Sequence, residues 1–225
     1  MVIEAGTSAE RRVPLTRGRV LQAAVDLADR GGIDALSMRK LGQELDVEAM
    51  ALYRHVRNKD DILDGIVEAI VGEIDDPGPG DDWKSTLRRK VVSARQVMLR
   101  HPWAPRVLEE RPSLGPTVLA YVDSVLGILL DGGFPLDLAH HALHVMSSRI
   151  LGFNQDLFDD GGESDPTPEA AAILARSMAD RYPHLTKLAL AASHDGGLGR
   201  CDDDVEFYFG LDLIIDGLER LRDRG

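Results

Sequence analysis

The sequence lacks several features that would indicate a secreted or membrane-spanning protein. Its 225 residues include a single cysteine, Cys201, which excludes an intrachain disulfide framework. The longest apolar runs, such as VLGILL at 125–130, are too short to span a bilayer. The N-terminal MVIEAGTSAERR has no apolar core followed by a cleavage site, so we expect no secretory signal. We therefore expect a cytoplasmic protein with no membrane partner.

The chain also lacks net positive charge. It has 26 Lys and Arg against 38 Asp and Glu, a formal net charge of -12. Residues 1–60 hold ten basic and nine acidic side chains, a net of +1, whereas residues 61–225 hold sixteen and twenty-nine, a net of -13. A uniformly acidic protein repels nucleic acid. A chain whose basic residues are concentrated at one end can still bind it there.

Hydrophobic periodicity indicates helices throughout. No segment shows sustained apolar–polar alternation with β-branched enrichment, so we expect an all-α fold. Ser37 and Asn58 precede helical segments and are suited to cap their first N–H groups. The loop DDPGPGDD at 75–82 is the clearest break. Helices are expected at about 16–30, 38–45, 48–56, 59–74, 83–101, 103–110, 114–130, 135–157, 169–182, 184–193 and 203–222.

The segment LSMRKLGQELDVEAMALYRHVRNKDDIL, residues 36–63, carries the most specific pattern. Two short helices are joined by LDV at 45–47, which permits only a sharp corner. Asp46 tolerates the left-handed backbone that such a corner often needs. Leu52 and Val56 are placed to pack inward against the first helix. The pattern is that of a helix-turn-helix whose second helix is presented outward.

The residues that we expect to contact DNA are outward-facing side chains around this second helix: Arg39, Ala49, Met50, Tyr53, His55 and Lys59. Met50 and the alanine methyl suit thymine methyl groups in a major groove, and Tyr53 can reach a phosphate or a base edge. Arg39 is placed to read a base, most naturally guanine. A basic arm ahead of the first helix is expected from Arg11, Arg12, Arg17 and Arg19. The alternative is a set of solvated charges on a small helical bundle, but the combination favours DNA.

The same segment resembles the DNA-binding domain of the TetR (tetracycline-repressor) family, and LYRHVRNKDDIL at 52–63 is highly specific to it. The motifs HPW at 101–103, RPSLGP at 111–116, GF at 133–134 and VEFYFGLDLIIDGLE at 205–219 resemble the C-terminal domain of the tetracycline-repressor subclass. The resemblance implies an all-helical homodimer that binds double-stranded operator DNA and is released by a small-molecule effector. It assigns the DNA-contacting role to the six residues named above.

We therefore expect three parts: a flexible arm at 1–14, a three-helix DNA-binding domain at 15–60, and an effector-binding and dimerisation domain at 61–225. Two differences from the tetracycline repressors stand out. Ala49, Met50 and Ala51 replace polar residues, so a different operator is expected. Val107 stands nearest to the position of a histidine that holds drug-bound magnesium, which argues against metal–tetracycline binding.

The acidic body suggests a dimer contact and an effector pocket. The dimer is expected through the helices near 135–157 and 203–222, where Gly210 and Gly217 lie seven apart on one face and permit close helix approach. The candidate effector-binding residues are Trp103, Met146, Arg149, Phe153 and Asn154. Arg149 needs a partner within a mostly apolar helix, either a carboxylate of the chain or an acidic effector.

A second reading is a metal-binding protein or an enzyme built around two histidines. His140 and His144 are four apart and share a helical face, but no Glu or Cys at matching spacing accompanies them. The sequence has no nucleophile elbow, phosphate-binding glycine loop or zinc-protease helix. We expect no enzymatic activity, no cofactor and no metal, and the first hypothesis is a ligand-responsive repressor.

Overall fold

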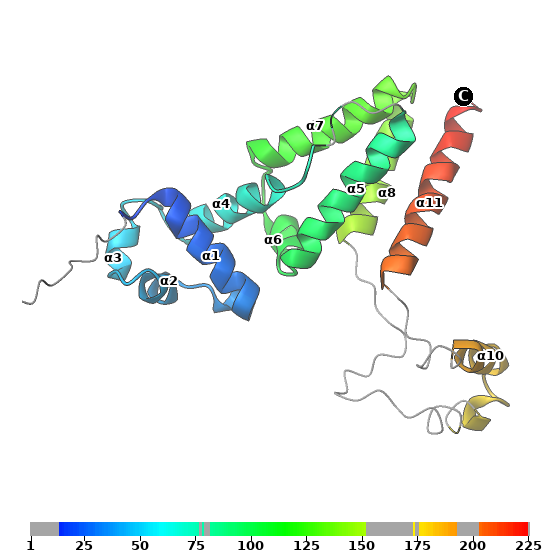
Figure 1. Cartoon of the computed structure of the whole chain (residues 1–225), viewed down its shortest axis with the longest axis horizontal. Coiled ribbons are helices and arrows are strands. Elements are labelled where there is room, and N and C mark those ends of the chain that lie inside the picture. Colours follow the sequence, from blue (N-terminus) through cyan, green and yellow to red (C-terminus); the bar gives the residue numbers. More distant parts are fainter. Residues whose placement is uncertain are drawn as a thin grey trace, which may run out of the picture. The chain divides into compact units, whose positions relative to one another are not determined.

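The computed structural model describes residues 14–76, 78, 82–151, 173, 176–192 and 203–224. The regular elements in these ranges are helical, which confirms the expected all-α class (Figure 1). They are α1 (Arg17–Gly31), the 3-10 turn η1 (Ile33–Ala35), α2 (Met38–Glu44), α3 (Ala49–Leu52), α4 (Lys59–Val71), α5 (Trp83–Arg100), α6 (Ala104–Glu110), α7 (Pro116–Asp131), α8 (Leu136–Leu151), α10 (Pro183–Ala192) and α11 (Asp203–Arg222). None of these described helices is long and apolar enough to cross a membrane.

The chain forms two compact units, Met1–Phe134 and Pro135–Gly225. In the first unit α4 packs against both α1 and α7, so the N-terminal helices and α4–α7 share one body. The boundary expected at residue 60 between a DNA-binding domain and an effector-binding domain stays a prediction. The α4 helix, which begins at Lys59, packs against helices on both sides of that boundary. The helix expected at 135–157 is described as far as Leu151, and most of the helix expected at 169–182 lies outside the described residues.

The N-terminal helices begin where capping residues predict. Thr16, Ser37 and Asn58 accept backbone N–H groups at the starts of α1, α2 and α4, which confirms the capping roles expected of Ser37 and Asn58. The α1 helix ends at Gly32, whose φ of 73° lies in the left-handed region. The apolar faces of α1 and α4 meet in a core whose most buried members are Val20, Ala24, Ala28, Ile62, Ile66 and Ile70.

The helix expected at 48–56 is much shorter than predicted. The α3 helix ends at Leu52, and the backbone then tightens, with His55 N donating to Leu52 O at 2.8 Å. This i→i+3 turn brings Val56, which is 2% exposed, into the core, after which extended Asn58 starts α4. The helix therefore ends before the turn that leads to the cap of α4, and Val56 is buried as the sequence predicted.

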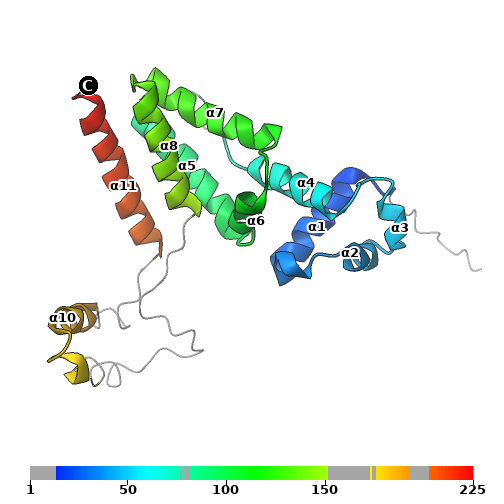
Figure 2. The ribbon, with the colours of Figure 1, turned by 180° about the vertical axis from the view of Figure 1, so that it is seen from behind.

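In the remainder of the first unit, α5 and α7 lie together, and Trp83 packs edge-on against Phe134 with ring centroids 4.7 Å apart. In the second unit α8 and α11 lie side by side (Figure 2). Met146 of α8 and Phe207 and Leu211 of α11 are almost fully buried. Each of these two helix pairs lies within its own unit, and the pair in the second unit carries Met146, Arg149 and the candidate dimer residues.

Candidate DNA interface and effector region

The corner between α2 and α3 depends on two backbone features. Asp46 has a φ of 52°, which confirms the left-handed conformation expected there. Gly42 lets α3 approach α2 closely, because a Cβ at this position would lie 2.8 Å from Val47 O and 3.2 Å from Ala49 N. Leu41 and Leu52 are fully buried beneath the corner. The second helix is thereby presented on the surface.

The outward side of α3 is apolar and exposed. Met50 is 75% exposed and Tyr53 is 47% exposed, while Ala49 is half-buried. Large apolar side chains exposed together often mark an interaction surface. The positions agree with those expected of a helix that enters a groove.

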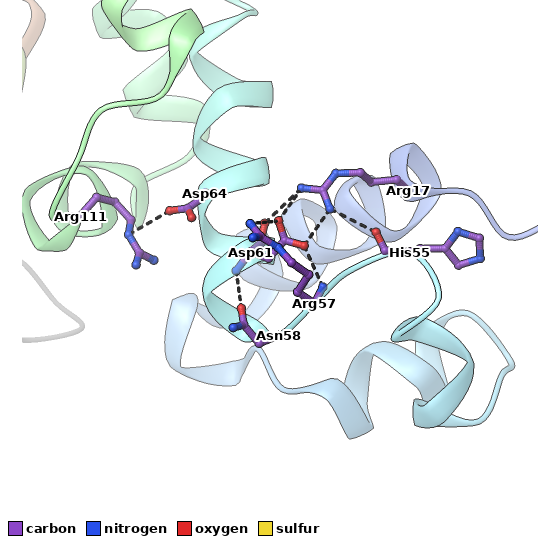
Figure 3. Close-up of polar contacts among 7 residues, drawn as sticks. All are labelled: Arg17, His55, Arg57, Asn58, Asp61, Asp64 and Arg111. Atoms are coloured by element: carbon purple, nitrogen blue, oxygen red, sulfur yellow. Dashed lines mark hydrogen bonds and ion pairs between the residues drawn. The ribbon is translucent and has the colours of Figure 1, made fainter.

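Cations border this apolar surface. Arg39 in the first turn of α2 and Lys59 at the start of α4 are exposed, and His55 is half-buried. The imidazole of His55 points away from the ion pairs around Asp61 (Figure 3). Its backbone carbonyl accepts a hydrogen bond from Arg17 Nη1 at 3.1 Å. This bond holds the end of the recognition segment, residues 49–57, which comprises α3 and the turn after it.

Arg17 belongs to an anchoring cluster instead of the basic arm in which the sequence analysis placed it. Its two terminal nitrogens donate to the two carboxylate oxygens of Asp61 at 2.9 Å each (Figure 3). Asp61 also accepts the backbone N–H of Arg57 at 2.8 Å, and its own N–H is capped by Asn58. The cluster joins α1, α4 and the end of the recognition segment. Arg11 and Arg12 lie outside the described residues.

The electrostatics of the cluster favour ionised Asp61. The side-chain hydrogen bonds from Arg17, and next the backbone N–H of Arg57, hold the pKa of Asp61 well below its usual value of 3.8, although burial opposes this. The Asp61 carboxylate also faces the positive end of α4.

Trp103 lies between α6 and the DNA-binding helices. It is 6% exposed, and its Nε1 donates to Asp29 Oδ1 of α1 at 2.7 Å. The same Asp29 oxygen lies 2.8 Å from His101 Nδ1, and Arg106 of α6 pairs with Asp34 at 3.0 Å. The indole therefore links the start of α6 to α1. Its expected role as a wall of the effector pocket stays a prediction.

Of the other predicted effector residues, Met146 is 1% exposed and Arg149 bridges α8 to α11. Arg149 Nη2 donates to the backbone carbonyl of Glu206 at 2.7 Å, and its guanidinium lies 5.1 Å from the centroid of Phe207. A backbone carbonyl and an aromatic ring of α11 are thus among the partners of this cation. Phe153 and Asn154 lie outside the described residues.

The two glycines of α11 differ in their surroundings. A Cβ on Gly210 would lie 2.9 Å from Arg149 Nε of the same chain, whereas one on Gly217 would meet nothing within 4 Å among the described residues. Gly210 therefore serves packing within the chain. On the outer side of α11, Phe209 is 62% exposed and Leu213 is 57% exposed. These residues form the exposed apolar side expected of a dimer contact.

The histidine pair lies on the surface of α8. The rings of His140 and His144 are 4.6 Å apart in an edge-on arrangement, and both residues are exposed. Within the described ranges no group of three or more His, Cys, Asp or Glu side chains is placed to hold a metal ion.

Two polar residues of the body were missed by sequence reasoning. Lys90 of α5 is 4% exposed; its Nζ lies 3.3 Å from Asp76 Oδ1 and 5.5 Å from the ring centroid of Tyr121 in α7. Burial raises the pKa of Tyr121 to about 12, so its phenol stays protonated at neutral pH. The Tyr121 hydroxyl is buried with no hydrogen-bond partner in the described part of the chain. The sequence signal that could have identified this pair is Lys90, which lies on the inward face of α5 beside Leu87, Val91 and Ala94.

Known sequences and structures resemble the chain over most of its length. Residues 20–66 match the profile of bacterial regulatory proteins of the tetR family, and residues 76–222 match the tetracyclin repressor-like C-terminal domain. An HTH-type transcriptional regulator of Saccharopolyspora erythraea is 40% identical over 209 residues, which cover 91% of this chain and 84% of that protein. The class A tetracycline repressor of Escherichia coli is 33% identical over 207 residues, 90% of each chain.

A solved structure shows the same arrangement. The TetR family protein ActR of Streptomyces coelicolor, in complex with actinorhodin, matches with a TM-score of 0.73 and 29% identity. The match covers 93% of this chain and 99% of ActR. The similarity therefore includes both the helix-turn-helix and the helical body.

Proposed function

Because the chain belongs to the TetR family of bacterial regulatory proteins, we propose that it is a repressor whose α2–α3 surface binds operator DNA and whose body binds a releasing effector. The single observation that carries the DNA-binding part is the exposed Met50 and Tyr53 on a helix-turn-helix, bordered by Arg39 and Lys59. Residues 1–60, which include this surface, carry a net charge of +1, whereas residues 61–225 carry a net charge of -13. The surface suits the groove and phosphates of a duplex.

The proposed DNA contacts have different roles. Ala49, Met50 and Tyr53 supply apolar and hydroxyl contacts to base edges, and Arg39 reads one base through its two donor nitrogens. His55 and Lys59 contact phosphates, which positions the helix without reading sequence. The three small or apolar residues at 49–51 favour an operator different from that of the tetracycline repressors.

The dimer is proposed through α8 and α11, because one recognition helix contacts only a few base pairs and a two-fold dimer doubles them. The exposed Phe209 and Leu213 of α11 are suited to be covered by a second copy of the chain. Two half-sites should then lie about 34–36 Å apart.

The effector is proposed to bind in the helical body, with Met146, Arg149, Phe153 and Asn154 as candidate contacts of the second unit. Trp103, in the first unit, is kept as a separate candidate. ActR binds actinorhodin in its solved complex, and we propose that this chain likewise binds a small organic molecule. Val107 is 2% exposed and has no metal-binding atom, which supports an effector that is not held through a metal at this position.

Selection of duplexes from a random pool by the purified protein tests the function. A two-fold symmetric sequence should be enriched. A ligand recovered from the native protein by mass spectrometry should release that duplex. Failure to enrich any sequence would remove the DNA-binding function. Enrichment without release by any recovered ligand would remove the effector part alone.

A further inference from the structure

Three histidine rings lie close together on the exposed side of α8. The ring centroids of His140 and His144 are 4.6 Å apart, and the ring of His141 lies 5.8 Å from that of His140. All three residues are exposed. Within the described part of the chain, no hydrogen bond or ion pair occupies the ring nitrogens of His140 or His144. These nitrogens are therefore available to a ligand that arrives from solvent.

The helix presents His140 and His144 as a pair. Both residues lie inside α8, which runs from Leu136 to Leu151, so their backbone positions are set by the regular helix. Residues four apart lie one above the other on a helical face, with Cβ atoms about 5–6 Å apart. Only the side-chain torsions then have to be chosen for both rings to reach one ligand. A pair of imidazoles at this spacing is pre-arranged for chelation.

The distance between the two rings fits a shared metal ion. Two imidazoles that bind one ion through nitrogens at about 2.0–2.1 Å have their ring centroids roughly 4.5–5 Å apart. The observed 4.6 Å lies in this range. The ring planes are 78° apart, in an edge-on arrangement. The second side-chain torsion of histidine is broad, so exposed rings can turn their nitrogens to one point without a change in the backbone.

The surroundings select the kind of ion. Imidazole nitrogen suits Ni²⁺, Cu²⁺ and Zn²⁺, whereas Mg²⁺ and Ca²⁺ prefer oxygen ligands. Residues 61–225 carry a net charge of -13, which attracts cations, and Asp137 lies in the first turn of the same helix. No third His, Cys, Asp or Glu of the described residues is placed to complete a ligand set. The remaining coordination positions are therefore open to water.

We propose that His140 and His144 chelate one divalent ion of a late first-row transition metal, namely Ni²⁺, Cu²⁺ or Zn²⁺. Spacing alone made this the weaker reading, because no Glu or Cys accompanies the pair. The ring distance and the unoccupied nitrogens now favour it. An edge-on aromatic contact also produces such a distance, but it requires no metal. The site goes beyond the proposed function, in which no metal takes part.

Calorimetric titration of the untagged full chain with Ni²⁺ tests the site, because an affinity tag would add histidines of its own. We expect saturable binding of one Ni²⁺ per chain. Mg²⁺ should show no saturable binding, since the pair offers nitrogen and not oxygen ligands. The measurement uses no DNA, so its failure leaves the proposed repressor function intact.

Matched variants locate the binding. His140→Ala and His144→Ala should each weaken the Ni²⁺ complex by at least about 10–100-fold, because loss of a ligand costs no less than loss of an outer-shell partner. Both positions are exposed, so helix content should not change. His184→Ala, at an exposed histidine of α10, should bind as the wild type does. The proposal is overturned if Ni²⁺ does not bind saturably, if one ion binds per two chains, or if His140→Ala and His144→Ala bind unchanged.

Discussion

Asp61 is the residue through which the recognition segment is attached to α4. Its carboxylate joins Arg17 of α1, the backbone of Arg57 and, through Arg17, the carbonyl of His55. Because these groups hold the pKa of Asp61 below its unfolded value near 3.8, ionised Asp61 stabilises the fold at neutral pH.

We predict that Asp61→Asn lowers the free energy of unfolding by about 1–3 kcal/mol at pH 7. The stabilisation by Asp61 is complete above pH 3.8 and is lost as pH falls through the depressed folded pKa. The difference between wild type and variant should therefore narrow on acidification below about pH 4. Urea unfolding at several pH values measures it, with the exposed Glu48→Gln as control; a difference that stays constant down to pH 2 contradicts the ion-pair account.

Alanine substitutions of Arg39 and Lys59 are predicted to weaken DNA binding in different ways. Arg39→Ala should cost about 1–3 kcal/mol on the operator and relax preference at one base position. Lys59→Ala should weaken operator and scrambled duplexes alike and reduce the salt dependence by about one unit of slope. Both side chains are exposed, so dimer and helix content should not change.

Titrations of the operator and a scrambled duplex at several salt concentrations separate the two roles. Arg89→Ala, at an exposed arginine of α5 to which neither DNA nor dimer contact is assigned, should leave both affinities unchanged. If Arg39→Ala lost the same affinity for both duplexes, Arg39 would contact a phosphate and would not read a base.

At the scale of elements, the α2–α3 corner is set by close backbone approach. Gly42→Ala would place a Cβ 2.8 Å from Val47 O, so α3 must shift. We predict a loss of about 1–3 kcal/mol in stability, as for other overpacked sites, together with weaker operator binding. Gly18→Ala in α1, where a Cβ meets nothing within 4 Å in the described structure, should be neutral or slightly stabilising. Chemical denaturation measures both; equal stability of the two variants would show that the corner is not tightly packed.

The sequence predicted the features that local chemistry determines. The caps at Ser37 and Asn58, the left-handed Asp46 and the exposed Met50 and Tyr53 follow from residues a few positions apart. The early end of α3 was not predicted: Val56 is buried as expected, but a turn and not a continued regular helix leads to it.

Long-range contacts could not be read from the sequence. Arg17 and Asp61 are 44 residues apart, and Trp103 and Asp29 are 74 apart. The periodic pattern places each side chain on a face but does not name the partner across from it. The same limit hid the ion pairs of Arg111 with α4.

At the scale of the whole molecule, the protein is acidic and each chain has few exposed cations near α3. Two copies of this surface are therefore needed for tight binding to DNA. A dimer through α8 and α11 provides this, and Leu213 on the exposed side of α11 is predicted to lie in it. Leu213→Asp should yield a folded monomer with operator affinity reduced by at least about 10³-fold, towards the non-specific level. Leu119→Asp, at a similarly exposed leucine of α7, should stay dimeric. Sedimentation of each variant decides the state, and a monomeric Leu213→Asp that binds the operator like the wild type contradicts the dimer requirement.

The exposed face of α3 is proposed to read the operator. The most direct test of this role is a fluorescence titration of the duplex selected by the protein, and of a scrambled duplex, with wild type and with a Met50→Asp, Tyr53→Asp double variant. The wild type should prefer the selected duplex by at least about 10³-fold. The double variant should lose this preference while it keeps its helix content and its dimer, since both side chains are exposed. A wild type that binds both duplexes equally, or a double variant that keeps the wild-type preference, would contradict this role of α3.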